Sequence, residues 1–275
     1  MNVVVAGQLA RDVVLLADEM PAAGAAADVR ERRETLGGKG ANQAVALAQL
    51  GARVSLVAVA GDDVIGDQLL AQAARDGIDV SYVVRREGAL SGLIVEVLDR
   101  HGQWRYLQDL PGPVLLTPED VDRARPALRK ADAVVVQLQQ PPEAVEVAAR
   151  QARGLVVFDG VPHRSLLKYA DVLRADEHEA QLLGADPREL LEAGPKLVVV
   201  ATAEGNRFLW ADGDLLVPVE DGPVVDTTGG GDSFVAALTV ALLRGDDPPA
   251  AARRATGASA STVRHAGGRP SLKPW

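Results

Sequence analysis

The chain has 275 residues, with 38 acidic and 29 basic side chains, a formal net charge of −9 at pH 7 and no cysteine. The acidic balance and an aromatic content of 3% argue against a protein that coats nucleic acid, which needs excess Lys and Arg and aromatic platforms for bases. The absence of cysteine excludes a disulfide framework, a thiolate metal site and a cysteine nucleophile.

The N-terminal residues give no sign of an export signal. Residues 1–7 form a short apolar run that lacks the basic start and the long apolar core of a signal peptide. No apolar stretch approaches the roughly 18 residues that a membrane helix requires. We therefore expect a cytoplasmic protein that contacts neither membrane nor nucleic acid.

Short β-branched runs alternate with helical patterns along the chain. Their continuous apolarity is typical of buried parallel strands, which we expect over 3–6, 54–59, 133–136, 155–158 and 197–200. Apolar residues at helical spacing predict helices over 41–50, 65–75, 118–128, 143–153, 177–183, 234–243 and 250–262. This alternation predicts a doubly wound α/β sheet.

Two segments interrupt the alternation. Residues 22–36 carry no helical stripe, and the segment 90–108 reads as two strands, 90–98 and 104–108, joined by a turn. Strands without helices between them predict a small separate sheet formed by inserts at about 8–36 and 88–110. We expect this sheet to lie as a lid over the strand ends of a single domain spanning 1–275.

The first motif that carries chemistry is Gly-Gly-Lys-Gly at Gly37–Gly40, directly before an expected helix. Glycines allow close backbone approach, and a helix N-terminus directs amides toward an anion or a polar ligand. The segment is not a P-loop, because Arg33 replaces the required first glycine and Gly40 the required Ser or Thr. A turn with a solvated lysine is the plain alternative, but the polar pair Asn42 and Gln43 on an apolar helix favours a binding site.

The second motif is Asp-Thr-Thr-Gly-Gly-Gly-Asp at Asp226–Asp232, which leads into another apolar helix. Three consecutive glycines have a high ordering entropy, which makes sense where successive amides must converge on one point. Asp232 could be merely the N-cap of the helix. Beside an anion hole, however, a carboxylate can take the proton of an attacking hydroxyl, so the motif predicts group transfer to a hydroxyl.

Together the two motifs resemble the signatures of the ribokinase family, also called the PfkB carbohydrate kinases. Residues 37–44 match its sugar-binding signature and residues 226–232 its catalytic signature, about 190 residues apart and in the expected order. The resemblance implies a ribokinase-like α/β fold, with a mainly parallel sheet flanked by helices and a small β-sheet lid. It implies ATP-dependent phosphorylation of a sugar hydroxyl, with Asp232 as the base and an anion hole formed by the amides of Gly229, Gly230 and Gly231.

The resemblance also implies which residues hold the substrates and ions. It assigns to the sugar Asp12, Gly38, Lys39, Asn42 and Gln139. It assigns to the nucleotide Asp176, Thr202, Glu204, Gly205 and Gly231. It assigns Glu179 to Mg²⁺ through water. It also assigns three oxygen donors to K⁺, namely Asp226, Thr228 and Ser271.

Each of these assignments has a plain structural alternative. Asp12 could be a surface charge of the lid, and Lys39 a solvated loop lysine. Asp176 and Glu179 could form a capping box at a helix start, which is compatible with the metal role. His178 between them is expected to be exposed.

Departures from the family pattern leave the substrate open. Ala10 stands where ribokinases commonly have Asn, Gln139 replaces an acid, and the glycine of the nucleotide loop at 202–206 is displaced. Ribose is the leading acceptor, and the alternatives are a nucleoside kinase of the same fold and a catalytically silent sugar-binding protein. A Rossmann dehydrogenase is disfavoured, because no Gly-x-Gly-x-x-Gly follows the first strand.

The expected lid strands carry apolar side chains, including Leu93, Val95 and Val97. A small sheet with an exposed apolar face often pairs with a partner. Because ribokinases that resemble this chain pair their lids, we expect a homodimer through the lid.

Overall fold

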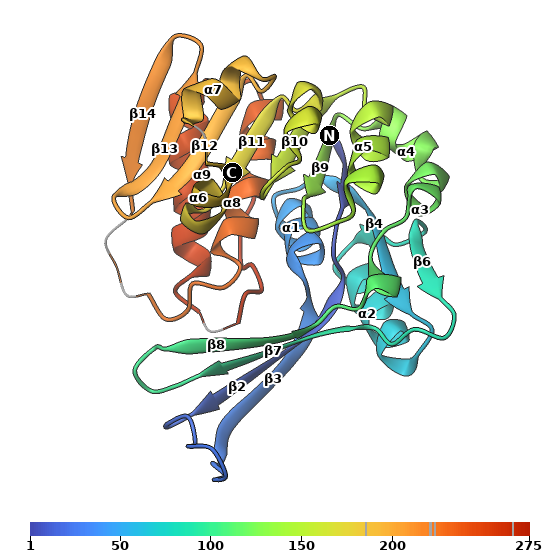
Figure 1. Ribbon diagram of the computed structural model, residues 1–275, viewed down its shortest axis with the longest axis vertical. Helices are drawn as coiled ribbons and strands as arrows, with labels where there is room; N and C mark the ends of the chain where they lie inside the picture. The colour runs from blue at the N-terminus through green and yellow to red at the C-terminus, as the bar shows by residue number, and fades with distance from the viewer. Residues whose placement is uncertain (185, 220–221, 223, 266) are drawn as a thin grey trace.

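A computed structural model describes residues 1–184, 186–219, 222, 224–265 and 267–275. It contains a large sheet with helices on both faces and a smaller second sheet (Figure 1). In the described residues the strands of the large sheet lie in the order β14 (Gly213–Pro218), β13 (Gly205–Trp210), β12 (Leu197–Thr202), β11 (Val172–Ala175), β10 (Leu155–Asp159), β9 (Ala133–Gln137), β1 (Asn2–Ala6), β4 (Arg53–Gly61) and β5 (Ile78–Asp79), and β6 (Val83–Arg86) also pairs with β4. All of these pairs are parallel except those of β13 with β12 and β14.

The central strands alternate their side chains between two helical layers. In β1, Val3 and Val5 belong to one core cluster and Val4 and Ala6 to the other. The first layer consists of α1 (Lys39–Gln49), α2 (Val64–Arg75), α8 (Gly230–Leu243) and α9 (Pro248–Thr262). The second consists of α3 (Pro118–Arg123), α4 (Arg125–Lys130), α5 (Pro142–Gln151), the 3₁₀ helix η2 (Arg164–Tyr169), α6 (Glu177–Leu183) and α7 (Pro187–Glu192). None of the helices in the described part of the chain is both long and apolar enough to cross a membrane.

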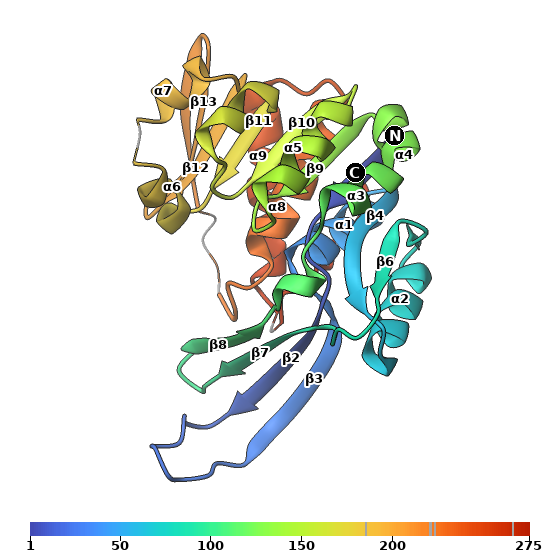
Figure 2. The ribbon, with the colours of Figure 1, turned by 45° about the vertical axis from the view of Figure 1, so that its right-hand side comes forward.

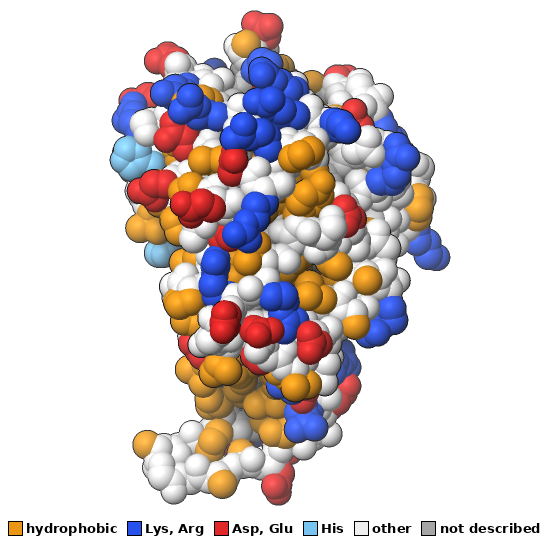
Figure 3. Space-filling model, turned by 90° about the vertical axis from the view of Figure 1, so that its right-hand side faces the viewer, with side chains coloured by type: hydrophobic (Ala, Val, Ile, Leu, Met, Phe, Trp, Pro, Cys, Tyr) orange, Lys and Arg blue, Asp and Glu red, His pale blue; other side chains and the backbone are white. Residues whose placement is uncertain are grey.

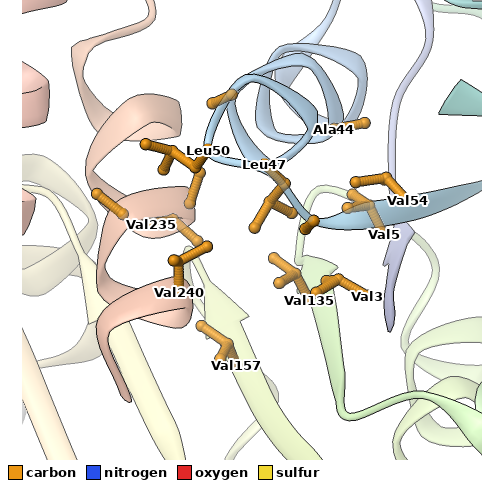
Figure 4. Packing of buried hydrophobic residues seen from close by; sticks show 14 of the residues in the cluster. Val3, Val5, Ala44, Leu47, Leu50, Val54, Val135, Val157, Val235 and Val240 are labelled. Carbon is orange, nitrogen blue, oxygen red and sulfur yellow. The ribbon is translucent and has the colours of Figure 1, made fainter. Parts of the chain in front are cut away.

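Figure 4 shows how the first layer packs. Ala44 and Leu47 of α1 lie over the valines of β1 and β4, while Val240 of α8 approaches Val157 of β10. Leu47 is fully buried, and burying a leucine side chain contributes about 1.5–3 kcal/mol. This packing fixes the N-termini of α1 and α8, where both glycine motifs lie.

The second sheet is built from the two segments that were expected to form it. Its order is β3 (Val29–Gly37), β2 (Ala10–Ala17), β7 (Gly92–Leu98) and β8 (Trp104–Asp109). It projects from the main body as a narrow extension (Figures 2 and 3). The β2–β7 pair is parallel, and the β2–β3 and β7–β8 pairs are antiparallel.

The fold predicted from the sequence is confirmed, with corrections to single elements. The helix expected over 118–128 is two helices: α3 ends before Ala124 and α4 begins at Arg125, with Pro126, which has no amide to donate, in its first turn. The prediction left out α7 and several strands, namely β5, β6, β11, β13 and β14. β5 and β11 have only two and four residues, and β6, β13 and β14 mix charged or glycine residues with apolar ones, so none shows the continuous apolar run of the predicted strands. With six residues, α7 is too short to show a helical period.

Candidate active site

A cavity of about 800 Å³ lies where the parallel strands of the large sheet end. Gln8, Gln139, Asp159, Asp176 and Thr202 line it, each at or just after the carboxyl end of a different strand. The N-termini of α1 and α8 and one face of the second sheet complete the wall. In open α/β sheets ligands bind at this edge.

The first glycine motif packs against Asp12 of β2. A Cβ built on Gly37 would lie 1.9 Å from the carboxyl carbon of Asp12, and one on Gly40 would lie 2.7 Å from the backbone of Gln8. Gly38 has φ 83°, which favours glycine. The motif thus lets the N-terminus of α1 close onto β2.

Asp12 is buried at the cavity wall and is not a surface charge. Its exposed fraction is 8%, and its Oδ1 has no hydrogen-bond partner among the described residues. Burial raises the pKa of Asp12 to about 7, although a hydrogen bond from the Gly38 amide opposes this shift. Asn42 and Gln139 line the same cavity, and the Gln139 carbonyl accepts a 3.4 Å hydrogen bond from Gln8.

Asp232 lies in the first turn of α8, and its interpretation as the N-cap is wrong. The N-cap is Gly229, with φ 69°, and it makes no side-chain capping bond. Gln43 donates from Nε2 to Asp232 Oδ1 at 3.2 Å and to Asp159 Oδ2 at 2.8 Å. This amide bridge holds the Asp232 carboxylate at the cavity wall.

The electrostatics of Asp232 suit a proton acceptor. Burial and the negative charge of Asp159 raise its pKa to about 8, against the opposing effects of Lys39, Arg174 and a hydrogen bond from Asn42. A base with a pKa near the working pH can both accept and release a proton.

The three glycines before Asp232 are closely packed, and Gly229, which meets backbone and has φ 69°, is the one that admits no side chain. A Cβ on Gly229 would lie 1.9 Å from the carbonyl oxygen of Gly268, and one on Gly230 2.8 Å from Val263. A Cβ on Gly231 would lie 3.0 Å from the guanidinium of Arg174. The first amides of a helix have no intrahelical acceptor, so the amides of this turn can hold an anion beside Arg174.

Two cations near the cavity are held by carboxylates. Lys39 Nζ lies 3.1 Å from Glu179 Oε1, and Arg174 Nη1 lies 3.1 Å from Asp159 Oδ1. Burial lowers the pKa of Lys39, but the charges of Asp159, Glu179 and Asp232 outweigh that effect and raise it. Lys39 is therefore a fixed cation of the wall and not a free loop lysine.

The capping box at the start of α6 is present. Asp176 Oδ1 accepts from the Glu179 amide at 2.8 Å, and Glu179 Oε2 accepts from the Asp176 amide at 2.9 Å. Because Oε1 of Glu179 accepts from Lys39, both of its oxygens are engaged. These residues fit a hydrated Mg²⁺, which keeps several waters, better than direct coordination. His178 is exposed, as expected.

Of the residues assigned to the nucleotide loop, only some line the cavity. Thr202 lines the cavity with Asp176, whereas Glu204 is exposed and is not among the lining residues. Gly205 has φ 145°, and a Cβ there would lie 2.2 Å from the carbonyl oxygen of Val217. Gly205 thus serves the pairing of β13 with β14.

The predicted K⁺ donors are only partly brought together. Asp226 accepts from the amides of Thr228 at 2.9 Å and Gly267 at 2.6 Å. Ser271 is exposed and shares no hydrogen bond with either predicted partner among the described residues. Over the same residues, no group of three or more His, Cys, Asp or Glu side chains is arranged to hold a metal ion.

Comparison with known proteins identifies the family. The family model described as pfkB family carbohydrate kinase matches residues 1–275. The chain belongs to this family. The kinase is similar to the ribokinase of Bacillus subtilis, with 32% identity over 247 residues, 86% of this chain and 84% of the relative. It spans only 47% of a 28% identical bifunctional ribokinase/ribose-5-phosphate isomerase A from Fructilactobacillus sanfranciscensis, with 86% of its own length aligned.

The solved structures agree with this assignment. A ribokinase from Thermotoga maritima matches the kinase with a TM-score of 0.85 and 26% identity, covering 98% of this chain and 94% of that one. The ribokinase-like fold is thereby confirmed, and the kinase is a phosphotransferase with an alcohol group as acceptor.

Several residues that line the kinase's cavity were not predicted from the sequence. Asp159 and Arg174 lie at the ends of adjacent strands, and a polar side chain that ends an apolar run is the signal for such positions. Glu96 and Tyr106 lie on the second sheet. Glu96 is the only charged residue in the apolar run of β7, which could have marked it.

Proposed function

We propose that this carbohydrate kinase transfers the γ-phosphoryl group of ATP to a sugar hydroxyl, with ribose as the leading acceptor. The observation that carries the proposal is the Asp232 carboxylate, which Gln43 holds at the wall of the cavity that Asp12 and the glycine turn of α8 also line. Asp12 offers an unpartnered oxygen to a sugar hydroxyl, and the similar proteins named above are ribokinases.

In the proposed reaction Asp232 takes the proton of the acceptor hydroxyl. The hydroxyl oxygen forms a bond to the γ-phosphorus as the bond from that phosphorus to the β,γ-bridging oxygen breaks, which releases ADP. Amides of Gly229, Gly230 and Gly231, with Lys39 and Arg174, stabilise the negative charge on the transferred group. Asp232 later gives its proton to solvent.

The same proposal assigns the ions. Mg²⁺ bound with the nucleotide would neutralise phosphate charge, and Asp176 and Glu179 would hold its water ligands. Asp226, Thr228 and Ser271 remain the proposed donors to K⁺. Thr202 would contact the nucleotide, and Glu204 and Gly205 remain the proposed contacts of the loop, although neither lines the cavity.

We also infer that the second sheet acts as a lid and joins two copies of the kinase. β3 and β8 are the edge strands of this sheet and are exposed along most of their length, so each presents backbone groups that a second copy could pair with. Light scattering at micromolar concentration is expected to give twice the chain mass of 28.8 kDa. A monomeric mass would refute the dimer without affecting the chemistry.

The acceptor is tested by measuring ADP release with ATP, Mg²⁺ and a panel of ribose, deoxyribose, fructose, adenosine, cytidine and pseudouridine. We expect a free sugar, with ribose the leading candidate, to have the highest kcat/KM of the panel. A clear preference for the nucleosides would support the nucleoside kinase instead. Sugar binding without ADP release would support a silent sugar-binding protein.

A further inference from the structure

Four side chains from α1, β10, β11 and α8 form a continuous chain of contacts beside the cavity. Arg174 donates from Nη1 to Asp159 Oδ1 at 3.1 Å, and Gln43 donates from Nε2 to Asp159 Oδ2 at 2.8 Å. The same Nε2 donates to Asp232 Oδ1 at 3.2 Å. Both carboxylate oxygens of Asp159 are therefore engaged, one by a cation and one by the amide that contacts the proposed base.

This chain of contacts is buried. Gln43 is fully buried, Asp159 is 2% exposed, and Asp232 and Arg174 are nearly as enclosed. A buried charge is costly unless a partner of opposite charge or hydrogen bonds hold it. The second ion pair of Arg174, with Glu179 Oε2, is longer, at 4.0 Å. Asp159 is thus the closer anchor of the guanidinium.

The two ends of the chain reach the two groups that the transfer requires. The guanidinium of Arg174 packs against Gly231, where a Cβ would lie 3.0 Å from Nη2. Gly231 directly precedes Asp232 in the first turn of α8. Because Asp159 contacts Arg174 directly and Asp232 through Gln43, a shift of Asp159 would move the cation of the proposed phosphate site and the proposed base together.

Asp159 also acts on Asp232 through its charge. Asp232 is faced by Lys39 from α1, Asp159 from β10 and Arg174 from β11, and on the α6 side Glu179 partly neutralises the two cations. Burial raises the pKa of Asp232 most and the charge of Asp159 adds to this, whereas the two cations lower it. Removing the charge of Asp159 would end its repulsion and leave Arg174 without its nearest counter-charge. Both changes would lower the pKa of Asp232.

We propose that Asp159 is a positioning residue of the phosphoryl transfer. One of its oxygens holds Arg174 against the glycine turn of α8, and the other holds the Asp232 carboxylate through Gln43. The inference rests on the proposed phosphoryl transfer and adds a residue to its machinery. The proton of the acceptor hydroxyl still goes to Asp232, and no proton passes along the bridge, because the Gln43 amide donates to both carboxylates.

The test compares pH profiles of ADP release with ATP, Mg²⁺ and the best acceptor of the panel. Asp159→Asn keeps the shape of the side chain and removes its charge. We expect kcat/KM at pH 9 to fall about 10- to 100-fold, and the acid limb of the profile to move to lower pH, so that the deficit shrinks toward pH 6. A merely structural role would lower the rate by the same factor at every pH. Gln43→Met keeps both charges and cuts the bridge, so it is expected to lower kcat without moving the limb to lower pH.

Asp214→Asn is the matched control. Asp214 forms a comparable pair with Arg207, at 2.6 Å between the outer strands β13 and β14, and is not among the residues that line the cavity. Its profile is expected to match wild type. An unshifted limb in Asp159→Asn, or a kcat/KM within about twofold of wild type, overturns the inference while phosphoryl transfer still stands. Wild-type kcat in Gln43→Met overturns it as well, and this result does not depend on the folding of Asp159→Asn.

The inference and the proposed function fail in different experiments. If no acceptor releases ADP with wild type, the proposed function fails. NMR of protein with carboxyl-labelled aspartate then decides the inference, with the Asp232 signal assigned by its loss in Asp232→Asn. We expect Asp232 to titrate at lower pH in Asp159→Asn than in wild type. An unchanged titration would overturn the role of Asp159.

Discussion

Asp232 shows how residue-scale environment sets the chemistry. It is buried beside Asp159, and this raises its pKa to about 8. Since a general base must be ionised to act, kcat/KM for the sugar is expected to rise with pH through about 8 and then level off. Steady-state ADP release between pH 6 and 9.5 measures the profile. A rate that is flat across this range would contradict the assignment of Asp232 as the base.

Gly37 shows that a glycine of the sugar motif acts by making room for Asp12. In Gly37→Ala the new methyl would overlap the Asp12 carboxyl, at 1.9 Å, and displace it. We expect KM for the sugar to rise about tenfold or more, because a buried polar contact of about 1–3 kcal/mol is lost, with a smaller effect on KM for ATP.

Gly112→Ala is the matched control for this change. Nothing lies within 4 Å of a Cβ at Gly112, and its φ is not positive. Its kinetics are expected to match wild type. Unchanged sugar affinity in Gly37→Ala would show that Asp12 does not hold the sugar.

At this scale, the sequence could predict Asn42 and Asp232 because they lie in glycine motifs with a definite spacing, and Asp12 because the family carries an acid shortly after the first strand. It could not predict that Gln43 joins Asp159 to Asp232, since the partners come from three elements more than 70 residues apart along the chain. Whether each acid caps its helix could also be decided only from the structure. Asp176 takes part in a capping box, whereas Asp232 makes no capping bond.

At the scale of elements, the turn before α8 contains one position, Gly229, whose backbone contact admits only glycine. Gly229→Ala combines a left-handed φ of 69° with a 1.9 Å overlap on the Gly268 carbonyl oxygen. We expect a loss of about 2–4 kcal/mol of unfolding free energy, measured by urea denaturation, together with loss of turnover.

Gly245→Ala separates the two contributions to this loss. Gly245 has φ 86°, but nothing lies within 4 Å of a Cβ there. It is expected to cost only the backbone term of about 1–2 kcal/mol. Equal losses in the two variants would mean that the contact with Gly268 is unimportant.

The success of the element predictions followed the strength of the local pattern. Long apolar helices such as α8 and continuous strands such as β9 were found because burial on one or both faces leaves a clear pattern. Strand β3 is exposed and charged along most of its length, so only the absence of a helical stripe pointed to it. Its place beside β2 depends on tertiary pairing.

At the scale of the whole molecule, three buried carboxyls couple the site to stability. Burial raises the pKa of Asp12 and Glu96 to about 7 and that of Asp232 to about 8. The unfolded chain loses these protons at lower pH than the folded protein does. Their contribution therefore destabilises the fold progressively as pH rises from about 4 to about 8.

The consequence is measurable in an Asp232→Asn variant, which removes one of the three groups. Its melting temperature is expected to match wild type near pH 4.5 and to exceed it by a few degrees near pH 8.5. Scanning calorimetry at both values checks this. A constant difference across the range would show that Asp232 has an ordinary pKa in the folded state.

The resemblance of two short motifs was enough to predict the fold and the reaction class of the whole chain. It could not reveal that Glu96, Tyr106 and Trp104 line the cavity, since they lie outside both motifs and meet only when β7 and β8 fold over the strand ends. The part of the cavity wall that the second sheet forms therefore needed the three-dimensional structure.

The most direct test of the account is the kcat of Asp232→Asn with ATP, Mg²⁺ and the best acceptor of the panel. Wild type is expected to release ADP and form the sugar phosphate in equal amounts. The variant should lose about 10²- to 10⁴-fold in kcat while calorimetry shows ATP and sugar affinities within a few-fold of wild type. Near-wild-type turnover in the variant would contradict the central claim that Asp232 accepts the proton of the attacking hydroxyl.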